Sequence, residues 1–292
     1  WDYIEHLKST IEGDLSGLKI AIDCSNGSAS RTAPRLFEEL GADCTLLFHH
    51  PDGVNINDKC GSTNMSRLRT FVMENHFDAG IAFDGDADRC LAVDESGNII
   101  DGDFIMAICA ADMKSRNRLA KNTAVGTIMS NLGFIHFCRD NGIHFEATKV
   151  GDRYVLEQML LEGYNFGGEQ SGHIIFLDYA TTGDGELTAI QLLSILKRRN
   201  ARLSSLDTLM QRLPQVMVNV TVSAEGKLRY YTDPEIRRAV HKAEQALGDN
   251  GRIIVRPSGT EPLIRVMTEG ENYPMIDSIA HEVADLIQEK LS

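Results

Sequence analysis

Three features are missing from this 292-residue sequence, and each absence excludes a class of protein. None of the six cysteines belongs to a CxxC pair, so neither a zinc ribbon nor a thioredoxin-like redox motif is expected. No apolar run approaches the roughly 18 residues of a membrane-spanning helix. Basic residues are not in excess, and the formal net charge of −13 argues against binding to nucleic acid or to an anionic membrane. A small anionic substrate stays allowed, because it needs only a local cluster of Arg and Lys.

The N-terminal residues contain no secretory signal. The segment Trp1–Glu5 is already acidic, where a signal peptide would have a basic and then an apolar segment. The first residue is not Met, so we expect a fragment of a longer protein. Cysteines without a pairing pattern fit a reducing compartment, and we predict buried thiols and a cytoplasmic location. The length suffices for two domains or more, at about 100–200 residues per domain.

Strand-like and helix-like segments alternate along most of the chain, which predicts an α/β fold. A strand at 19–23 is followed by a turn, a helix and a second strand at 44–48. The same order recurs further along, with strands at 123–127 and 144–147. Two βαβ units in the same order indicate two homologous domains.

The last part of the chain has a different pattern. After Pro214, alternating apolar residues predict a strand at 216–222, and two helices flank two further strands behind it. We therefore predict two homologous βαβ-type mixed-sheet domains, residues 1–111 and 112–214, and a small C-terminal α+β domain, residues 215–292.

Three aspartates at alternate positions, followed at once by an arginine, form the most distinctive segment. Alternate side chains of an extended segment point the same way, so Asp84, Asp86 and Asp88 are expected to converge. Three carboxylates this close repel one another unless a hard cation lies between them, and oxygen-only ligation suits Mg²⁺. Arg89 is then placed to bind a phosphoryl group, because a guanidinium matches phosphate oxygens in pairs.

Two other interpretations fit this segment less well. A calcium EF-hand needs Gly at the sixth loop position, where the chain has Arg89, and helices on both sides, where the chain has strand-like residues. A solvated acidic turn accounts for a single DxD pair, but it does not account for three aspartates in register between two strands. The sequence therefore predicts a magnesium site.

A second chemical segment lies between two predicted strands near the C-terminus. Gly259 allows the backbone amides to face one anion, and the hydroxyls of Ser258 and Thr260 add donors. Arg256 and Arg265 add positive charge. The alternative is an ordinary hairpin turn, in which Ser-Gly is common. Two arginines and two hydroxyls around one glycine favour a phosphate site.

A third segment, Gly167–His173, is rich in glycine, so a ligand can approach its backbone closely. Glu169 and Ser171 alternate along it, and both are expected to hydrogen-bond the hydroxyls of a sugar. His173 is in the same phase and has the chemistry for proton transfer. The alternative is a glycine-rich turn with a structural histidine. A further basic pair lies at a predicted strand end: Lys149 and Arg153.

The three segments occur in the order of the metal, sugar and phosphate loops of the α-D-phosphohexomutases, which the chain resembles over essentially its whole length. Within that superfamily, three further segments are similar to those of the bacterial phosphoglucosamine mutase family: Pro51–Asn57, Lys149–Tyr154 and Thr181–Gly185. The resemblance implies an isomerase that interconverts glucosamine 6-phosphate and glucosamine 1-phosphate, on the way to UDP-N-acetylglucosamine and peptidoglycan precursors. It also implies a phosphoserine that donates its phosphoryl group and takes it back through a 1,6-bisphosphate.

The resemblance assigns roles to the residues of the three loops. Mg²⁺ is held by Asp84, Asp86, Asp88 and the phosphoserine, and glucosamine 1,6-bisphosphate or glucose 1,6-bisphosphate is the primer. Arg89 and His173 are the expected catalytic residues. The expected substrate-binding residues are Lys149, Arg153, Glu169, Ser171, Arg256, Ser258, Gly259, Thr260 and Arg265. The expected partner is a small sugar phosphate, with neither nucleic acid nor membrane, and a homodimer is one option for the assembly.

One departure from the family pattern bears on activity. The phosphoserine of the family lies in a Thr-Ala-Ser-His-Asn-Pro-like loop of an N-terminal domain, and no segment of this sequence matches that loop. We therefore expect the second to fourth domains of the enzyme, inactive by themselves. Two rival interpretations remain: a phosphomannomutase/phosphoglucomutase of the same superfamily, and a non-catalytic fragment that binds sugar phosphates.

Overall fold

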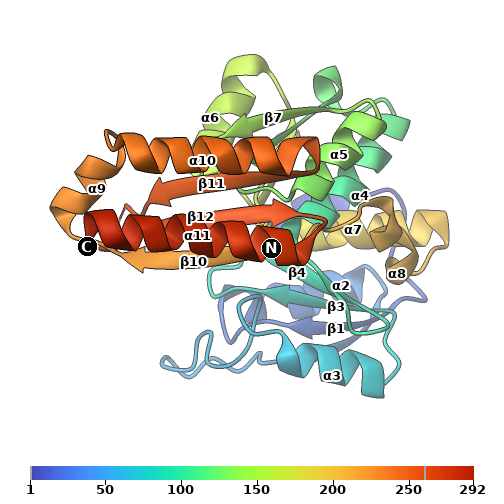
Figure 1. Ribbon diagram of the computed structural model, residues 1–292. Coiled ribbons are helices and arrows are strands. Elements are labelled where there is room, and N and C mark those ends of the chain that lie inside the picture. The colour runs from blue at the N-terminus through green and yellow to red at the C-terminus, as the bar shows by residue number, and fades with distance from the viewer. Residues whose placement is uncertain (1, 260) are drawn as a thin grey trace. The chain divides into compact units, whose positions relative to one another are not determined.

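The computed structural model describes residues 2–259 and 261–292, which fall into two compact units, residues 1–211 and 212–292 (Figure 1). The strands are β1 Lys19–Asp23, β2 Asp43–Leu47, β3 Ala79–Phe83, β4 Cys90–Asp94, β5 Ile99–Ile100, β6 Thr123–Thr127, β7 His144–Thr148, β8 Phe166–Gly168, β9 Ile174–Phe176, β10 Gln215–Thr221, β11 Gly251–Pro257 and β12 Leu263–Gly270. The helices are α1 Asp2–Ser9, α2 Ala33–Glu39, α3 Ser66–Glu74, α4 Gly102–Ser115, α5 Leu132–Asp140, α6 Asp152–Glu162, α7 Gly185–Arg199, α8 Leu203–Leu206, α9 Ala224–Tyr230, α10 Pro234–Leu247 and α11 Tyr273–Leu291. Across these described ranges, none of the helices combines the length and the apolar character needed to span a bilayer.

The first sheet of the N-terminal unit has the strand order β2-β1-β3-β4-β5. β1 pairs in parallel with β2 and β3, whereas β4 runs antiparallel to β3. Side chains of β1 alternate between two cores: Ile20 and Ile22 enter the large central cluster, and Ala21 packs with Leu68 and Val72 of α3. The loops after β1, β2 and β3 therefore leave from one edge of this sheet.

The second sheet repeats this arrangement with the order β7-β6-β8-β9. β6 is parallel to β7 and β8, and β9 is antiparallel to β8. Helix α6 covers one face, where Val155 and Met159 pack with Val125 and Ile175. The repeated βαβ pattern of the sequence is thus confirmed as a repeated sheet topology.

Helices α4 and α7 lie between the two sheets. α4 is apolar on nearly all sides, α7 is buried along most of its length, and each contacts strands of both sheets. The predicted domain boundary at 111/112 falls inside α4, which continues to Ser115. The break between the compact units, at 211/212, lies near the predicted boundary at 214/215.

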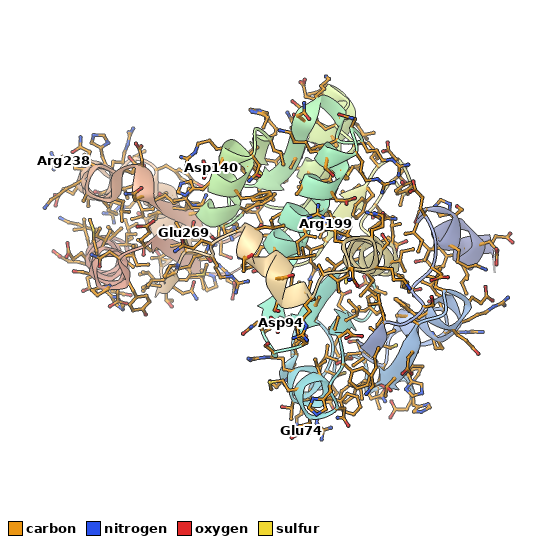
Figure 2. All side chains as sticks on the ribbon, turned by 90° about the vertical axis from the view of Figure 1, so that its right-hand side faces the viewer. Glu74, Asp94, Asp140, Arg199, Arg238 and Glu269 are labelled. Atoms are coloured by element: carbon orange, nitrogen blue, oxygen red, sulfur yellow. The ribbon has the colours of Figure 1, made fainter. Side chains whose placement is uncertain are left out.

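The C-terminal unit has an antiparallel sheet with the order β10-β12-β11, and α10 and α11 lie side by side across it (Figure 1). Its core includes Ile236, Ile264 and Ile287. In Figure 2, Glu269 lies within this unit and Arg238 lies at its outer edge. Glu269 is fully buried and forms an ion pair with Arg252 at 2.6 Å. The α+β character predicted for the tail is confirmed.

Candidate functional site

The three aspartates of the predicted metal loop do converge. The loop joins β3 to β4, and one carboxylate oxygen from each of Asp84, Asp86 and Asp88 lies within 4.8 Å of the others. The geometry differs from the extended segment expected from the sequence. Ala87 has a left-handed φ of 60°, and its N–H donates to the Asp84 carbonyl at 3.2 Å. A turn, and not strand alternation, therefore brings the carboxylates together.

The charges of this loop are unbalanced toward the negative. Burial, followed by the charge of Asp88, raises the pKa of the Asp84 carboxyl to about 6. The single guanidinium in the loop is that of Arg89, whose Nε lies 3.8 Å from a carboxylate oxygen of both Asp84 and Asp88. Among the described residues, the buried Oδ1 of Asp88 has no hydrogen-bond partner. An oxygen-only cluster with an unpartnered oxygen fits a hard divalent cation.

The loop after β1 supports the backbone of the metal loop. The N–H of Ser28 donates to the Gly85 carbonyl at 2.9 Å. A Cβ on Gly27 would lie 2.2 Å from that carbonyl oxygen, so this approach requires glycine. The turn after β1 therefore supports the metal loop, a contact that the sequence did not indicate.

The predicted sugar loop follows β8, and hydrogen bonds join it to the metal loop. The Gly172 carbonyl accepts from the N–H of Cys90 at 3.1 Å, directly after the metal loop, and the Gln170 carbonyl accepts from the N–H of Gly102 at 3.0 Å. The Glu169 carboxylate accepts from the N–H of Gly151 at 2.9 Å. Ser171 is exposed. The structure therefore brings the sugar loop against the metal loop.

The basic pair predicted beside the sugar loop lies at the end of β7 and the start of α6. Gly151, between the two basic residues, is the residue whose N–H the Glu169 carboxylate binds. The side chain of Arg153 is 81% exposed and forms an ion pair with Glu157 at 2.6 Å. Lys149 lies 5.8 Å from the ring centroid of Tyr154. Both cations are therefore open to solvent on the same edge of the second sheet as the sugar loop.

His173 is not a surface residue. It is 3% exposed, and its Nδ1 lies 3.0 Å from Oδ2 of Asp88. Its Nε2 accepts a hydrogen bond from the N–H of Gly183 at 3.1 Å. Gly183 lies in the segment Thr181–Gly185, which the resemblance singled out without assigning it a role. Gly185, the first residue of α7, donates its N–H to the Ala87 carbonyl at 2.9 Å, so the start of this helix also contacts the metal loop.

The predicted phosphate loop belongs to the C-terminal unit. Arg256 of β11 and Arg265 of β12 are directly opposite each other in the antiparallel register. Like charges in that position are unfavourable unless an anion lies between them. Arg265 pairs with Glu261. A Cβ on Gly259 would meet no atom within 4 Å, so this tip is open, and Thr260 lies outside the described residues.

Side chains of helix α9 donate hydrogen bonds to backbone carbonyls of β11 and of the phosphate loop. The sequence did not indicate this contact. The Nζ of Lys227 donates to the Ser258 carbonyl at 2.6 Å, and the hydroxyl of Tyr230 donates to the Val255 carbonyl at 2.9 Å. The N–H of Ser258 donates to the Leu263 carbonyl at 2.9 Å, while its Oγ accepts from the N–H of Glu261 at 3.2 Å. Ser258 is 7% exposed, and these hydrogen bonds fix its place in the loop.

Comparison with known proteins assigns the chain to a family. Models of phosphoglucomutase/phosphomannomutase match in succession: α/β/α domain II over residues 1–97, α/β/α domain III over residues 101–216, and the C-terminal domain over residues 217–286. Phosphoglucosamine mutase from Clostridium tetani is 55% identical over 289 residues, which are 99% of this chain and 64% of that protein. Phosphoglucosamine mutase from Caldanaerobacter subterraneus subsp. tengcongensis is also 55% identical, over 291 residues that cover 65% of its length.

Solved structures show the same fold. A phosphoglucomutase/phosphomannomutase family protein from Burkholderia thailandensis matches with a TM-score of 0.83 at 23% identity, over 100% of this chain and 65% of that one. Aspergillus fumigatus N-acetylphosphoglucosamine mutase, in complex with GlcNAc-6P and magnesium, matches with a TM-score of 0.79 at 19% identity, over 99% of this chain and 65% of that one. The chain spans 64–65% of the length of the curated relatives named above. With three consecutive domain models matched in order, the chain belongs to the phosphoglucomutase/phosphomannomutase family of phosphohexomutases.

Proposed function

We propose that this chain forms the metal, sugar and phosphate sites of a phosphoglucosamine mutase, which interconverts glucosamine 6-phosphate and glucosamine 1-phosphate. The observation that carries the proposal is the aspartate cluster, whose charge is unbalanced and whose Asp88 Oδ1 is buried without a hydrogen-bond partner among the described residues. The glucosamine substrate is supported by relatives at 52–55% identity that bear this name.

The cluster fits Mg²⁺, and Asp84, Asp86 and Asp88 would hold it. When bound, the cation would neutralise charge on the oxygens of the phosphoryl group being transferred. Arg89 lies beside the same carboxylates and would bind those phosphoryl oxygens in pairs. A 1,6-bisphosphate of glucosamine or glucose is the proposed primer, and a substituted form of Aspergillus fumigatus N-acetylphosphoglucosamine mutase has been solved in complex with glucose 1,6-bisphosphate.

The other two loops would bind the rest of the substrate. Glu169 and Ser171 would hydrogen-bond sugar hydroxyls, with Lys149 and Arg153 as cations on the same sheet edge. In the C-terminal unit, the opposed arginines would hold the phosphate that does not react, in exchange for the present Arg265–Glu261 ion pair. The residues proposed for that phosphate are Arg256, Ser258, Gly259, Thr260 and Arg265.

A cytoplasmic location is part of the proposal. All six cysteines are free, and five of them are buried. Burial raises the pKa of the Cys44 and Cys138 thiols to about 12, so these thiols stay protonated and unreactive. We therefore propose no catalytic role for the cysteines.

Turnover tests the proposed substrate against the rival one. The test uses a longer polypeptide, in which this chain is joined to the part of the curated relatives that it does not cover. This polypeptide is expected to turn over glucosamine 6-phosphate in preference to glucose 6-phosphate and mannose 6-phosphate. Its Asp86→Ala variant should be inactive, and the surface variant Asp285→Ala should not. Residues 1–292 alone are expected to bind glucosamine 6-phosphate without turning it over. Preference for a mannose or glucose phosphate would favour the phosphomannomutase/phosphoglucomutase alternative.

A further inference from the structure

Asp152 is an exposed acid at the edge of the candidate site, without a role in the metal, sugar or phosphate loops. It is the first residue of α6, and its side chain is 61% exposed. The neighbouring guanidinium of Arg153 forms its ion pair with Glu157. Among the described residues, the one basic side chain with a nitrogen within 4.0 Å of the Asp152 carboxylate is His173. The negative charge of Asp152 is therefore not neutralised by a lysine or an arginine of the described chain.

The start of α6 does not use this carboxylate as a hydrogen-bonding cap. The residue that caps the helix is Gly151, which has no side chain, whereas α7 and α10 are capped by the carboxylates of Asp184 and Asp233. An acid in the first turn still stabilises a helix through the helix dipole, and this is the alternative role for Asp152. A test of any role in binding must therefore include thermal unfolding.

Contacts with the sugar loop, Gly167–His173, fix the position of Asp152. The N–H of Gly151, the preceding residue, donates to the Glu169 carboxylate at 2.9 Å. Oδ2 of Asp152 lies 4.0 Å from Nε2 of His173, the last residue of the loop. The exposed carboxylate therefore lies beside residues that are proposed to bind the sugar.

The proposed substrate differs from its rivals by one charge on the sugar ring. Glucosamine has an amine at C2, where glucose and mannose have a hydroxyl. Such an amine is largely protonated at neutral pH, as is an α-amino group, whose pKa is about 7.7–8.0. An ammonium group has donors only, so a site selects it with an acceptor that carries negative charge. Glu169 already accepts a backbone N–H, whereas Asp152 has no donor among the described residues.

We propose that Asp152 binds the protonated C2 amine of glucosamine phosphates and thereby sets the preference for the amino sugar. This inference rests on the proposed function, and it gives the sugar site a negative charge that matches the positive charge of the substrate. The nearby cations Lys149 and Arg153 favour the anionic end of the substrate and repel its ammonium group, and the Asp152 carboxylate offsets that repulsion. A hydroxyl at C2 gains less from the same carboxylate, because a neutral donor forms a weaker hydrogen bond than a charged one.

Calorimetric titration of residues 1–292 at pH 7 tests the inference with ligands that share a 6-phosphate. The ligands are glucosamine 6-phosphate, glucose 6-phosphate and N-acetylglucosamine 6-phosphate, whose nitrogen is an uncharged amide. Asp152→Asn keeps the size of the side chain and removes its charge. It is expected to weaken the binding of glucosamine 6-phosphate about three- to tenfold, and to change the binding of the other two ligands by less than about twofold. Asp140→Asn is the matched control, because Asp140 is 63% exposed and ends α5 at the opposite edge of the sheet, before β7 begins.

The outcomes separate this role from the proposed function. If the parent prefers glucosamine 6-phosphate and Asp152→Asn keeps that preference, the proposed function stands and the role of Asp152 is wrong. Equal weakening of all three ligands also overturns the role, because Asp152 then supports the sugar loop or α6 and does not bind the amine. A melting temperature below that of Asp140→Asn identifies α6 as the cause of such a loss. Equal affinity of the parent for glucosamine and glucose 6-phosphates overturns the role as well, and turnover by the longer polypeptide then decides the proposed function by itself.

Discussion

A buried acid at the start of α7 makes stability depend on pH. Glu186 is 2% exposed, its Oε1 accepts from the hydroxyl of Thr32, and its Oε2 has no hydrogen-bond partner among the described residues. Burial, reinforced by the charge of Asp184, raises the pKa of the Glu186 carboxyl to about 8. The folded state therefore holds this proton over a range where the unfolded chain, with its ordinary value of 4.5, has lost it.

The sign of the pH effect follows from linkage. A pKa raised in the folded state gives stability that is complete below pH 4.5 and is lost as the pH rises toward 8 and above, here by roughly 2–4 kcal/mol. Glu186→Gln removes the titration, so it should raise the melting temperature by about 5 °C at pH 9. At pH 5 it should be equal to the parent or slightly less stable. Thermal unfolding at both pH values checks this, with the exposed Glu162→Gln as control, and an equal shift at both would contradict it.

The local sequence predicts which three aspartates form the proposed metal site. It does not predict which other residues hydrogen-bond to them. Asp84, Asp86 and Asp88 are close in sequence, so any compact conformation of five residues brings their carboxylates together, whether strand or turn. The partner of Asp88 could not be predicted in this way. His173 is 85 residues away, and its contact depends on how two sheets pack against shared helices. Gly183 carries no local signal beyond that of an ordinary turn.

At the scale of single elements, α9 is a short helix whose polar side chains hold the phosphate loop. Removing the ammonium of Lys227 would take away one positive charge near the opposed arginines and release the Ser258 carbonyl. Lys227→Met is therefore expected to weaken the binding of glucosamine 6-phosphate by about three- to tenfold, since a hydrogen bond to a charged group is worth roughly 1.5–3 kcal/mol and this one acts indirectly.

Calorimetric titration of three variants with glucosamine 6-phosphate separates the effect of positive charge on binding from the effect of support for the loop. Arg256→Ala, which removes a proposed direct contact, should weaken binding about tenfold or more. Tyr230→Phe loses only the hydrogen bond to the Val255 carbonyl, so its effect should be smaller than that of Lys227→Met. Unchanged affinity in Lys227→Met would show that α9 supports the fold and not the site.

The sequence predicts a helix or strand where its apolar residues recur with a regular period. It does not predict a domain boundary that falls in a helix without such a period. The βαβ units follow from apolar strands and amphipathic helices, each with one polar face. Helix α4 lies between two sheets and is apolar nearly all round, so the sequence shows no polar face where the chain leaves the first sheet. The boundary predicted at 111/112 therefore falls inside it. The antiparallel directions of β4 and β9 follow from the short loops that join them to β3 and β8, whereas the parallel pairing of β1 with β3 and of β6 with β8 joins segments far apart in the sequence, which no local pattern contains.

At the scale of the whole molecule, the two compact units have separate cores. The described residues of the buried apolar clusters in the N-terminal unit end at Met210, and those of the C-terminal cluster begin at Val216. Because the described clusters share no residue, a packing defect in one core is expected to leave the packing of the other unchanged. Two independent unfolding units are therefore expected.

Matched substitutions in the two cores test this independence. Ile264 in β12 and Ile81 in β3 are both fully buried on the central strands of their sheets, and Ile→Val at such a site costs about 0.5–1.5 kcal/mol. Hydrogen exchange resolved by segment should show Ile264→Val lowering protection in β10, β11 and β12 while β1 and β3 stay unchanged. Ile81→Val should do the reverse. If either substitution lowers protection equally in both units, the chain unfolds as one cooperative body, because only a shared transition spreads a local loss of packing energy to amides of both cores.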